Sequence, residues 1–164
     1  MRLAAQIKGG YYPAPPDAVA HAATFLKPPP GGSFCFLDPC CGEGAALQQL
    51  AETLDVPADH VCGIELDPQR AAKAQTLLAD SHILGPASAL GVACTRRVFS
   101  LAWVNPPFDD QMGGGDRVEL EFLRQTIDWI VPGGVLCFVI PESTSTHWSF
   151  RQLFIQWFEE ISIE

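Results

Sequence analysis

The chain has 164 residues, of which 48% are hydrophobic, and this composition supports one domain with a single buried core. We therefore do not expect a second folded domain. The net charge of -9 at pH 7 argues against a free-standing nucleic-acid binder, because affinity for phosphates normally comes from clustered Lys and Arg. No apolar run approaches the roughly 20 residues that a membrane span requires, so no membrane partner is predicted.

The cysteines point to a reducing compartment. Six are scattered along the chain without C-x-x-C spacing, and the N-terminus carries no secretory signal. Structural zinc sites need two spaced pairs of ligands, so the adjacent Cys40 and Cys41 do not predict one. The sequence predicts reduced thiols, a cytoplasmic location and no metal.

The first 32 residues are expected to form an arm and a helix. Residues 8–16 are dense in Gly, Tyr and Pro, which favour extended chain and turns. Asp17 is expected to cap a helix that runs to about residue 26, and the Pro and Gly residues over 28–32 end it.

From residue 33 onward, short apolar strands alternate with longer helical segments, which is typical of βα units on a parallel sheet. Strands are expected over residues 34–38, 60–65, 82–84, 99–105 and 135–140. Helices are expected over 44–54, 68–79, 118–131 and 147–157, the third of them ended by Pro132, Gly133 and Gly134. The predicted fold class is α/β, with a doubly wound, mainly parallel sheet and helices on both faces.

The last residues, 160–164, resemble the start of a further strand, and an unpaired strand start is an unusual end for such a sheet. We expect the core over residues 33–164 to be truncated at its C-terminus. A partner protein or a second copy of the chain would then complete the sheet.

In an open α/β sheet, ligands bind beyond the carboxyl ends of the strands. Gly42 and Gly44 follow the first strand and would let the backbone turn closely around a ligand, although a plain strand-to-helix turn also explains them. Glu65 ends the second strand, where a carboxylate can accept both hydroxyls of a ribose. Asp67 is expected to cap the next helix. Both acids also fit a reading as caps or solvent-facing residues.

The most specific cluster follows the fourth strand and reads Asn105, Pro106, Pro107, Phe108. The Asn105 side chain and the carbonyl of Pro106 offer two acceptors that can bind one NH2 group and orient its lone pair. Phe108 offers a face on which a planar base can stack. A turn without chemistry is the alternative. The glycine-rich segment 112–117 beyond it is either a loop that closes over substrate or a linker.

On these motifs the sequence resembles class I amino-methyltransferases, especially the adenine-N6 DNA methyltransferases with their [DNS]PP[YF] motif, and a poorly characterised bacterial family of such proteins. The resemblance implies a Rossmann-like fold, with S-adenosylmethionine as cofactor and S-adenosylhomocysteine as product. Such folds usually finish with an antiparallel hairpin, which we expect this chain to lack. The resemblance also implies that residues 1–32 pack over the cofactor site. Cofactor contacts are implied for Tyr11, Tyr12, Pro13, Pro15, Asp38, Pro39, Cys40, Gly42, Gly44, Glu65, Leu66 and Asn105. In that set Glu65 holds the ribose and Leu66 packs on the adenine, while residues 105–108 hold the substrate nitrogen.

The chain departs from this pattern after the third strand. Families of this kind often carry an Asp there that contacts the cofactor adenine, whereas this chain has Leu84, Gly85, Pro86, Ala87 and Ser88. Ser88 or a backbone group is expected to take its place, or cofactor affinity is reduced.

The sequence therefore predicts methyl transfer to an exocyclic amino nitrogen, with adenine N6 in DNA as the favoured target, flipped out of a duplex. The same chemistry could instead methylate N2 of guanine in RNA, N4 of cytosine, or the amide of a protein glutamine. The acidic net charge favours the protein substrate. A cofactor-binding but inactive module that needs a partner is a further alternative. A nicotinamide dehydrogenase is disfavoured, because the G-x-G-x-x-G fingerprint is incomplete.

Overall fold

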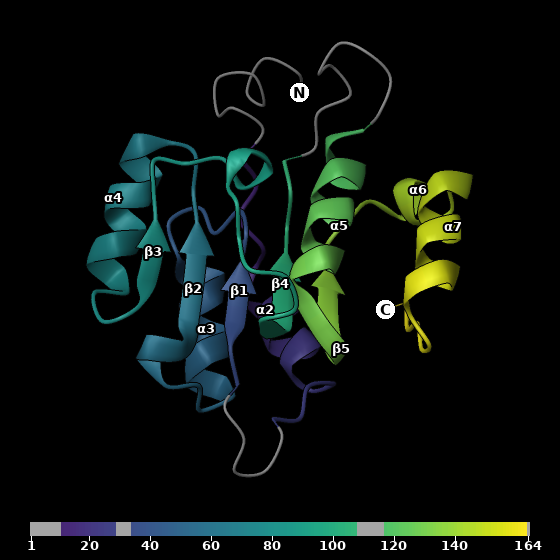
Figure 1. The fold of residues 1–164 in the computed structure, drawn as a ribbon. Helices are drawn as coiled ribbons and strands as arrows, with labels where there is room; N and C mark the ends of the chain where they lie inside the picture. Colours follow the sequence, from purple (N-terminus) through teal and green to yellow (C-terminus); the bar gives the residue numbers. More distant parts are fainter. Residues whose placement is uncertain (1–10, 29–33, 108–116, 164) are drawn as a thin grey trace.

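The computed structural model describes residues 11–28, 34–107 and 117–163. Five strands form one sheet: β1 (Phe36–Asp38), β2 (Val61–Ile64), β3 (His82–Leu84), β4 (Phe99–Val104) and β5 (Ile130–Phe138). Their order is β3-β2-β1-β4-β5, and every pairing is parallel (Figure 1). The predicted α/β class with a parallel, doubly wound sheet is confirmed.

Helices cover both faces of this sheet (Figure 1). They are α2 (Pro16–Ala23), α3 (Ala45–Thr53), α4 (Pro68–Leu77), α5 (Val118–Trp129), α6 (Glu142–Ser145) and α7 (Trp148–Trp157), with 3-10 turns η1 (Ala58–His60) and η2 (Ala89–Gly91). None of the helices in the described ranges is long and apolar enough to cross a membrane.

Strand side chains alternate between two cores. Phe36 and Leu101 pack with Leu47 and Leu50 of α3 on one face, together with Val19 of α2. The neighbouring strand residues, among them Leu37 and Ala102, pack on the other face against α5. Because both faces are covered, the central strands are apolar along their length, as buried parallel strands usually are.

The N-terminal helix shares its core with the sheet. Val19 and Ala23 are buried in the same cluster as α3. The helix begins two residues earlier than predicted, because Pro15 occupies the N-cap position and Pro16 the first turn, so the prediction of Asp17 as the cap is wrong. The division into residues 1–32 and 33–164 stays a prediction.

The predicted boundary between the third helix and the last strand is also wrong. Helix α5 ends at Trp129, and β5 begins at Ile130, which pairs with Phe99. The Pro-Gly-Gly sequence therefore lies within β5, at a register shift opposite Phe99 and Leu101, and does not end the helix. A Cβ at Gly134 would lie 2.5 Å from Cγ2 of Ile130 and 3.0 Å from the Ser100 carbonyl oxygen, so a side chain here would be crowded both by β5 itself and by β4. Residues 160–163 form no strand, contrary to expectation.

Candidate functional site

The strand order places three of the predicted clusters at one edge. Chain connections run from β1 outward to β2 and β3 on one side, and to β4 and β5 on the other, so the order reverses between β1 and β4. Ligands of doubly wound sheets bind at the carboxyl ends of the strands beside such a reversal. Asp38 ends β1 there, and Glu65 and Asn105 directly follow β2 and β4.

The loop after β1 turns sharply around Gly42 and Gly44. Both glycines have positive φ, +58° and +89°, and Gly44 is the N-cap residue of α3. The loop is tied to β2 by the Cys41 N–H, which donates to the Ile64 carbonyl at 3.0 Å. A Cβ at Gly42 would lie 2.5 Å from the ring of Tyr11, so the arm lies directly against this glycine. Any side chain at position 42 would therefore be strained and would displace Tyr11.

Asp38 is a buried carboxyl group, with 2% of its surface exposed. It accepts a hydrogen bond from the Cys40 N–H at 3.0 Å. Burial raises the pKa of Asp38 to about 7, and the negative charge of Glu65 adds to this rise, while the Cys40 hydrogen bonds oppose it. The group is thus poised to become a carboxylate when a cation binds beside it.

The thiols of this loop are not nucleophiles. Burial, reinforced by the charge of Asp38, raises the pKa of Cys40 and of Cys41 well above the ordinary thiol range. Both therefore stay protonated at neutral pH, and all six cysteines are free of disulfides. Within the described residues no group of three or more His, Cys, Asp or Glu could hold a metal ion.

Glu65 is held by four hydrogen bonds and is 5% exposed. Its Oε2 accepts from the Gly42 N–H at 2.9 Å. Its Oε1 accepts from the Asp67 N–H at 2.8 Å and from Arg70, at 3.1 Å from Nε and 2.8 Å from Nη2. The acid therefore links the loop after β1 to the start of α4.

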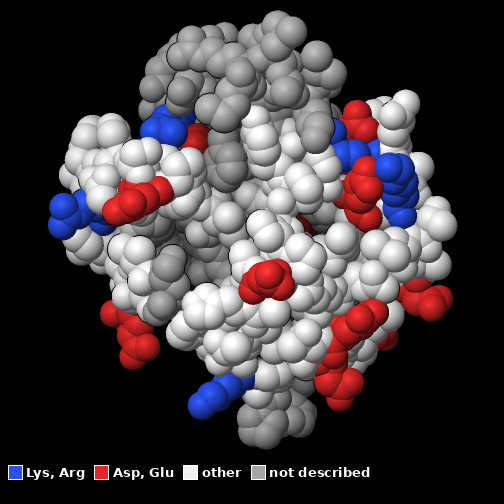
Figure 2. Space-filling view, turned by 180° about the vertical axis from the view of Figure 1, so that it is seen from behind, with Lys and Arg blue, Asp and Glu red and all other residues white. Residues whose placement is uncertain are grey.

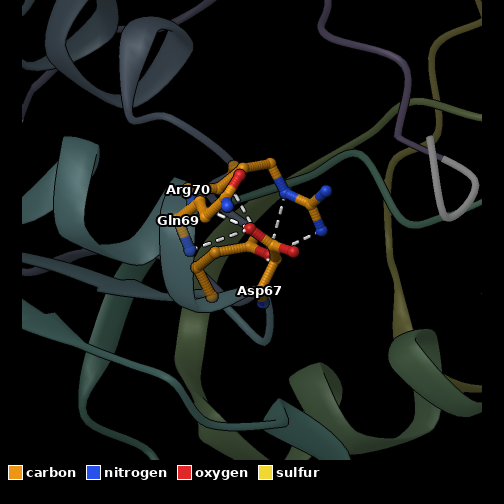
Figure 3. A network of polar contacts seen from close by, with 5 residues as sticks. Asp67, Gln69 and Arg70 are labelled. Carbon is orange, nitrogen blue, oxygen red and sulfur yellow. Dashed lines mark hydrogen bonds and ion pairs between the residues drawn. The ribbon is translucent and has the colours of Figure 1, made fainter.

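Asp67 caps α4, as predicted. Its Oδ1 accepts from the backbone N–H groups of Gln69 and Arg70, at 3.0 and 2.9 Å. Figure 3 shows these three residues gathered in one polar network. The first turn of α4 and the end of β2 consequently form one hydrogen-bonded unit.

Arg70 is a member of the site that the sequence reading missed. Its guanidinium carbon lies 4.7 Å from the centre of the Tyr11 ring, within the range of a cation–π contact. Tyr11 thus lies against both Gly42 and Arg70. The sequence offers no signal for this role, because an Arg in the first turn of an amphipathic helix usually faces solvent.

Asn105 is held by the arm. Its Nδ2 donates to the Tyr12 carbonyl at 2.8 Å, and a carbonyl can only accept, so the amide must turn its NH2 group toward Tyr12. The backbone N–H of Asn105 is directed at the Cys40 thiol. Pro106 is buried and Pro107 half-buried. Phe108 and segment 112–116 lie outside the described residues.

The remaining predicted site residues fall around the same edge with different exposure. Leu66 is 63% exposed and Tyr12 46% exposed, whereas Pro39 is buried. Pro13 and Pro15 are exposed in the arm. After β3, where the expected Asp is absent, the Ala87 N–H donates to the Glu65 carbonyl at 2.8 Å, and Ser88 is the N-cap residue of η2.

A sheet of this order, covered by helices on both faces, is the fold of class I S-adenosylmethionine-dependent methyltransferases, as its resemblance to solved structures shows. The chain belongs to the family described as "Uncharacterised methyltransferase family (DUF6094)", whose profile matches residues 1–163. No curated protein matches the sequence.

Solved structures are similar in fold at low identity. A protein of Listeria monocytogenes assigned to the class I S-adenosylmethionine-dependent methyltransferases is 19% identical with a TM-score of 0.72. The match covers 90% of this chain and 52% of that protein. The type IIG restriction endonuclease BpuSI is 14% identical with a TM-score of 0.75, covering 89% of this chain and 22% of its own. A geranyl diphosphate methyltransferase, solved in complex with GPP and sinefungin, is 13% identical with a TM-score of 0.55; the match covers 85% of this chain and 51% of that protein.

The chain thus spans about half the length of the first of these structures, at 52%, and a smaller part of the second, at 22%. Membership of a methyltransferase family confirms the prediction of a methyltransferase, and these neighbours support the predicted cofactor, S-adenosylmethionine.

Proposed function

We propose that the protein transfers a methyl group from S-adenosylmethionine to an exocyclic amino nitrogen, with adenine N6 in DNA as the favoured target. The observation that carries this proposal is the placement of Asn105. It follows β4 at the reversal of strand order, its backbone N–H is directed at Cys40 in the loop after β1, and its amide is oriented by the arm. The cytoplasmic location and bacterial origin expected from the sequence remain predictions.

The residues at this edge fit the cofactor by their chemistry. Two buried carboxyl groups, Asp38 and Glu65, stand where an amino acid part with a cationic ammonium group and a ribose would need acceptors. The exposed Leu66 follows Glu65 directly and offers apolar surface to an adenine ring. We assign the methionine part to the Asp38 side and the nucleoside to the Glu65 side.

Asn105 would act on the acceptor nitrogen by orientation. Because Nδ2 is bound to the Tyr12 carbonyl, the Oδ1 atom is the one that can accept a hydrogen bond from a substrate NH2 group. The Pro106 carbonyl offers a second acceptor, with no N–H at that residue to compete. S-adenosylmethionine supplies an electrophilic methyl group on a sulfonium when it is bound. Alignment of the nitrogen lone pair is an effect that can lower the barrier by several kcal/mol without a strong base.

The favoured target rests on the motif and on one neighbour. The chain is similar in fold, over 89% of its length, to an endonuclease that acts on DNA. The net charge of -9 points the other way and favours the second candidate, a protein glutamine amide. On the face shown in Figure 2, the described Lys and Arg residues are few, and most of them stand beside acidic ones.

The first experiment is calorimetric titration of the chain with S-adenosylmethionine, repeated on Glu65→Ala. Saturable binding that the substitution weakens supports the cofactor assignment. No binding by the unaltered chain would refute it.

The second experiment follows transfer of labelled methyl groups to duplex DNA, single-stranded DNA, RNA and a glutamine-containing protein, using the chain and Asn105→Ala. We expect the variant to retain saturable binding of S-adenosylmethionine but to lose about 100-fold or more in turnover. Transfer to the protein acceptor alone would favour the second candidate. Equal turnover by both forms would remove Asn105 from the mechanism.

A further inference from the structure

The proposed ribose subsite contains a cationic side chain, Arg70, that the sequence motifs do not predict. Arg70 donates two hydrogen bonds to Oε1 of Glu65, and its side chain is 21% exposed against 6% for that of Glu65. The pair is therefore mostly shielded from water, and its geometry is fixed at the carboxyl end of β2.

The two oxygens of Glu65 are occupied to different degrees. Oε1 receives three donors, from Asp67 N and from two nitrogens of Arg70, all within 3.1 Å. Oε2 receives one donor, the Gly42 N–H at 2.9 Å. A carboxylate oxygen has about two lone-pair sites, so Oε1 is saturated and Oε2 retains capacity for one more hydrogen bond.

Arg70 is held in this position from several directions. Its backbone N–H donates to the Asp67 cap at 2.9 Å, which places the residue in the first turn of α4. Its guanidinium also contacts the Tyr11 ring at 4.7 Å, on the arm that lies over Gly42. Displacing the guanidinium from Glu65 would break both the ion pair and this ring contact.

We propose that Arg70 is a positioning residue that restricts Glu65 to one ribose hydroxyl of the cofactor, bound through Oε2. This inference rests on the proposed function. It differs from the expectation that Glu65 accepts both hydroxyls, which stays a prediction. The recognition of the ribose then depends on one hydroxyl, and removing Arg70 frees Oε1 to accept the other.

The test uses 5'-methylthioadenosine with its 2'-deoxy and 3'-deoxy forms, which carry the nucleoside without the amino acid part. For the unaltered chain, calorimetry should show one deoxy form binding at least about tenfold more weakly than the ribo form, and the other within about threefold. For Arg70→Met, both deoxy forms should bind at least about fivefold more weakly than the ribo form. Each ratio is taken within one protein, so a general loosening of the fold affects all three ligands alike.

Lys73→Met is the matched control. Lys73 lies one turn further along α4 and pairs with Glu43 at 2.6 Å on an exposed surface, so this variant should keep the pattern of the unaltered chain. Arg70→Gln, with circular dichroism to verify folding, replaces Arg70→Met if the latter does not fold.

Two outcomes overturn the role of Arg70: equal losses for both deoxy forms in the unaltered chain, or a one-hydroxyl preference that persists without Arg70. If the unaltered chain binds S-adenosylmethionine in either case, only this inference fails. If it binds neither S-adenosylmethionine nor 5'-methylthioadenosine, the proposed function fails and this inference fails with it.

Discussion

At the scale of single residues, Asp38 destabilises the ligand-free protein above the pH at which an ordinary Asp ionises. Its pKa is raised to about 7 in the folded chain, mainly by burial, against an ordinary value of 3.8. Below both values the carboxyl group is neutral in either state and favours neither. As the pH rises from about 4 to about 7, the unfolded chain loses its proton first, so stability falls.

We therefore expect Asp38→Asn to raise the free energy of unfolding of the ligand-free protein, and to do so more at pH 8 than at pH 5. The upper limit of the gain at pH 8 is about 4 kcal/mol, at about 1.4 kcal/mol for each unit of pKa shift. Urea denaturation at the two pH values measures it. A variant that is less stable than the unaltered chain at pH 8 would contradict the burial argument.

The candidate site was partly predictable from the sequence at this scale. Asp67 could be identified as a cap because capping depends on residues two and three positions away. The bond from Asn105 to the Tyr12 carbonyl joins residues 93 positions apart, and no local pattern contains such a contact. Arg70 was missed for the same reason, since its stacking partner is on the distant arm.

At the scale of elements, hydrogen bonds at the start of α4 hold Glu65 in position. The Asp67 cap satisfies two N–H groups of the first turn, which also carries Arg70. The N–H of Asp67 itself binds Glu65 at 2.8 Å. Fraying of this turn would therefore reach the ribose subsite.

Removing this cap should have a measurable effect on stability. We expect Asp67→Ala to lower the free energy of unfolding by about 1 kcal/mol, the usual cost of losing an N-cap. Asp17→Ala is the matched control, because Asp17 lies in the first turn of α2, where the N-cap residue is Pro15 and no side-chain cap bond forms. The control should change stability by no more than about 0.5 kcal/mol. Equal losses in chemical denaturation would show that the cap bonds do not matter.

Most elements could be predicted, and the boundary between α5 and β5 shows why one of the predictions failed. The central strands carry apolar residues on both faces, and the turn at Gly42 and Gly44 depends on glycines that are close in sequence. Both features could therefore be predicted from the sequence. The end of α5 was misplaced because Ile130 pairs with Phe99 of the neighbouring strand. Pairing between strands decided this boundary, whereas the Pro-Gly-Gly pattern is also typical of a helix end.

At the scale of the whole molecule, five of the eight Lys and Arg residues in the described part of the chain are paired with the protein's own acids. The described part of the chain contains five ion pairs: Arg70 with Glu65, Lys73 with Glu43, Arg96 with Asp128, Arg117 with Glu119 and Arg124 with Glu121. The whole chain has ten Lys and Arg against nineteen Asp and Glu. Little positive charge is then left to attract a phosphate backbone, and a DNA substrate would need help from a partner protein or a second copy.

The chain alone should consequently bind DNA weakly, even if DNA is its substrate. We expect a Kd for a short duplex no tighter than about 10 μM at physiological salt, within the range of non-specific binding. The slope of log K against log salt should be shallower than about -2, because about 0.9 counterion is released for each phosphate contacted. Fluorescence anisotropy over a salt series measures both, and S-adenosylmethionine binding by the same preparation verifies that the site is intact. A slope steeper than about -5 would mean that a cluster of cations contacts phosphates despite the net charge. Such a result would place the DNA-binding surface on this chain. A slope shallower than about -2 would mean that a partner protein or a second copy must supply most of the phosphate contacts.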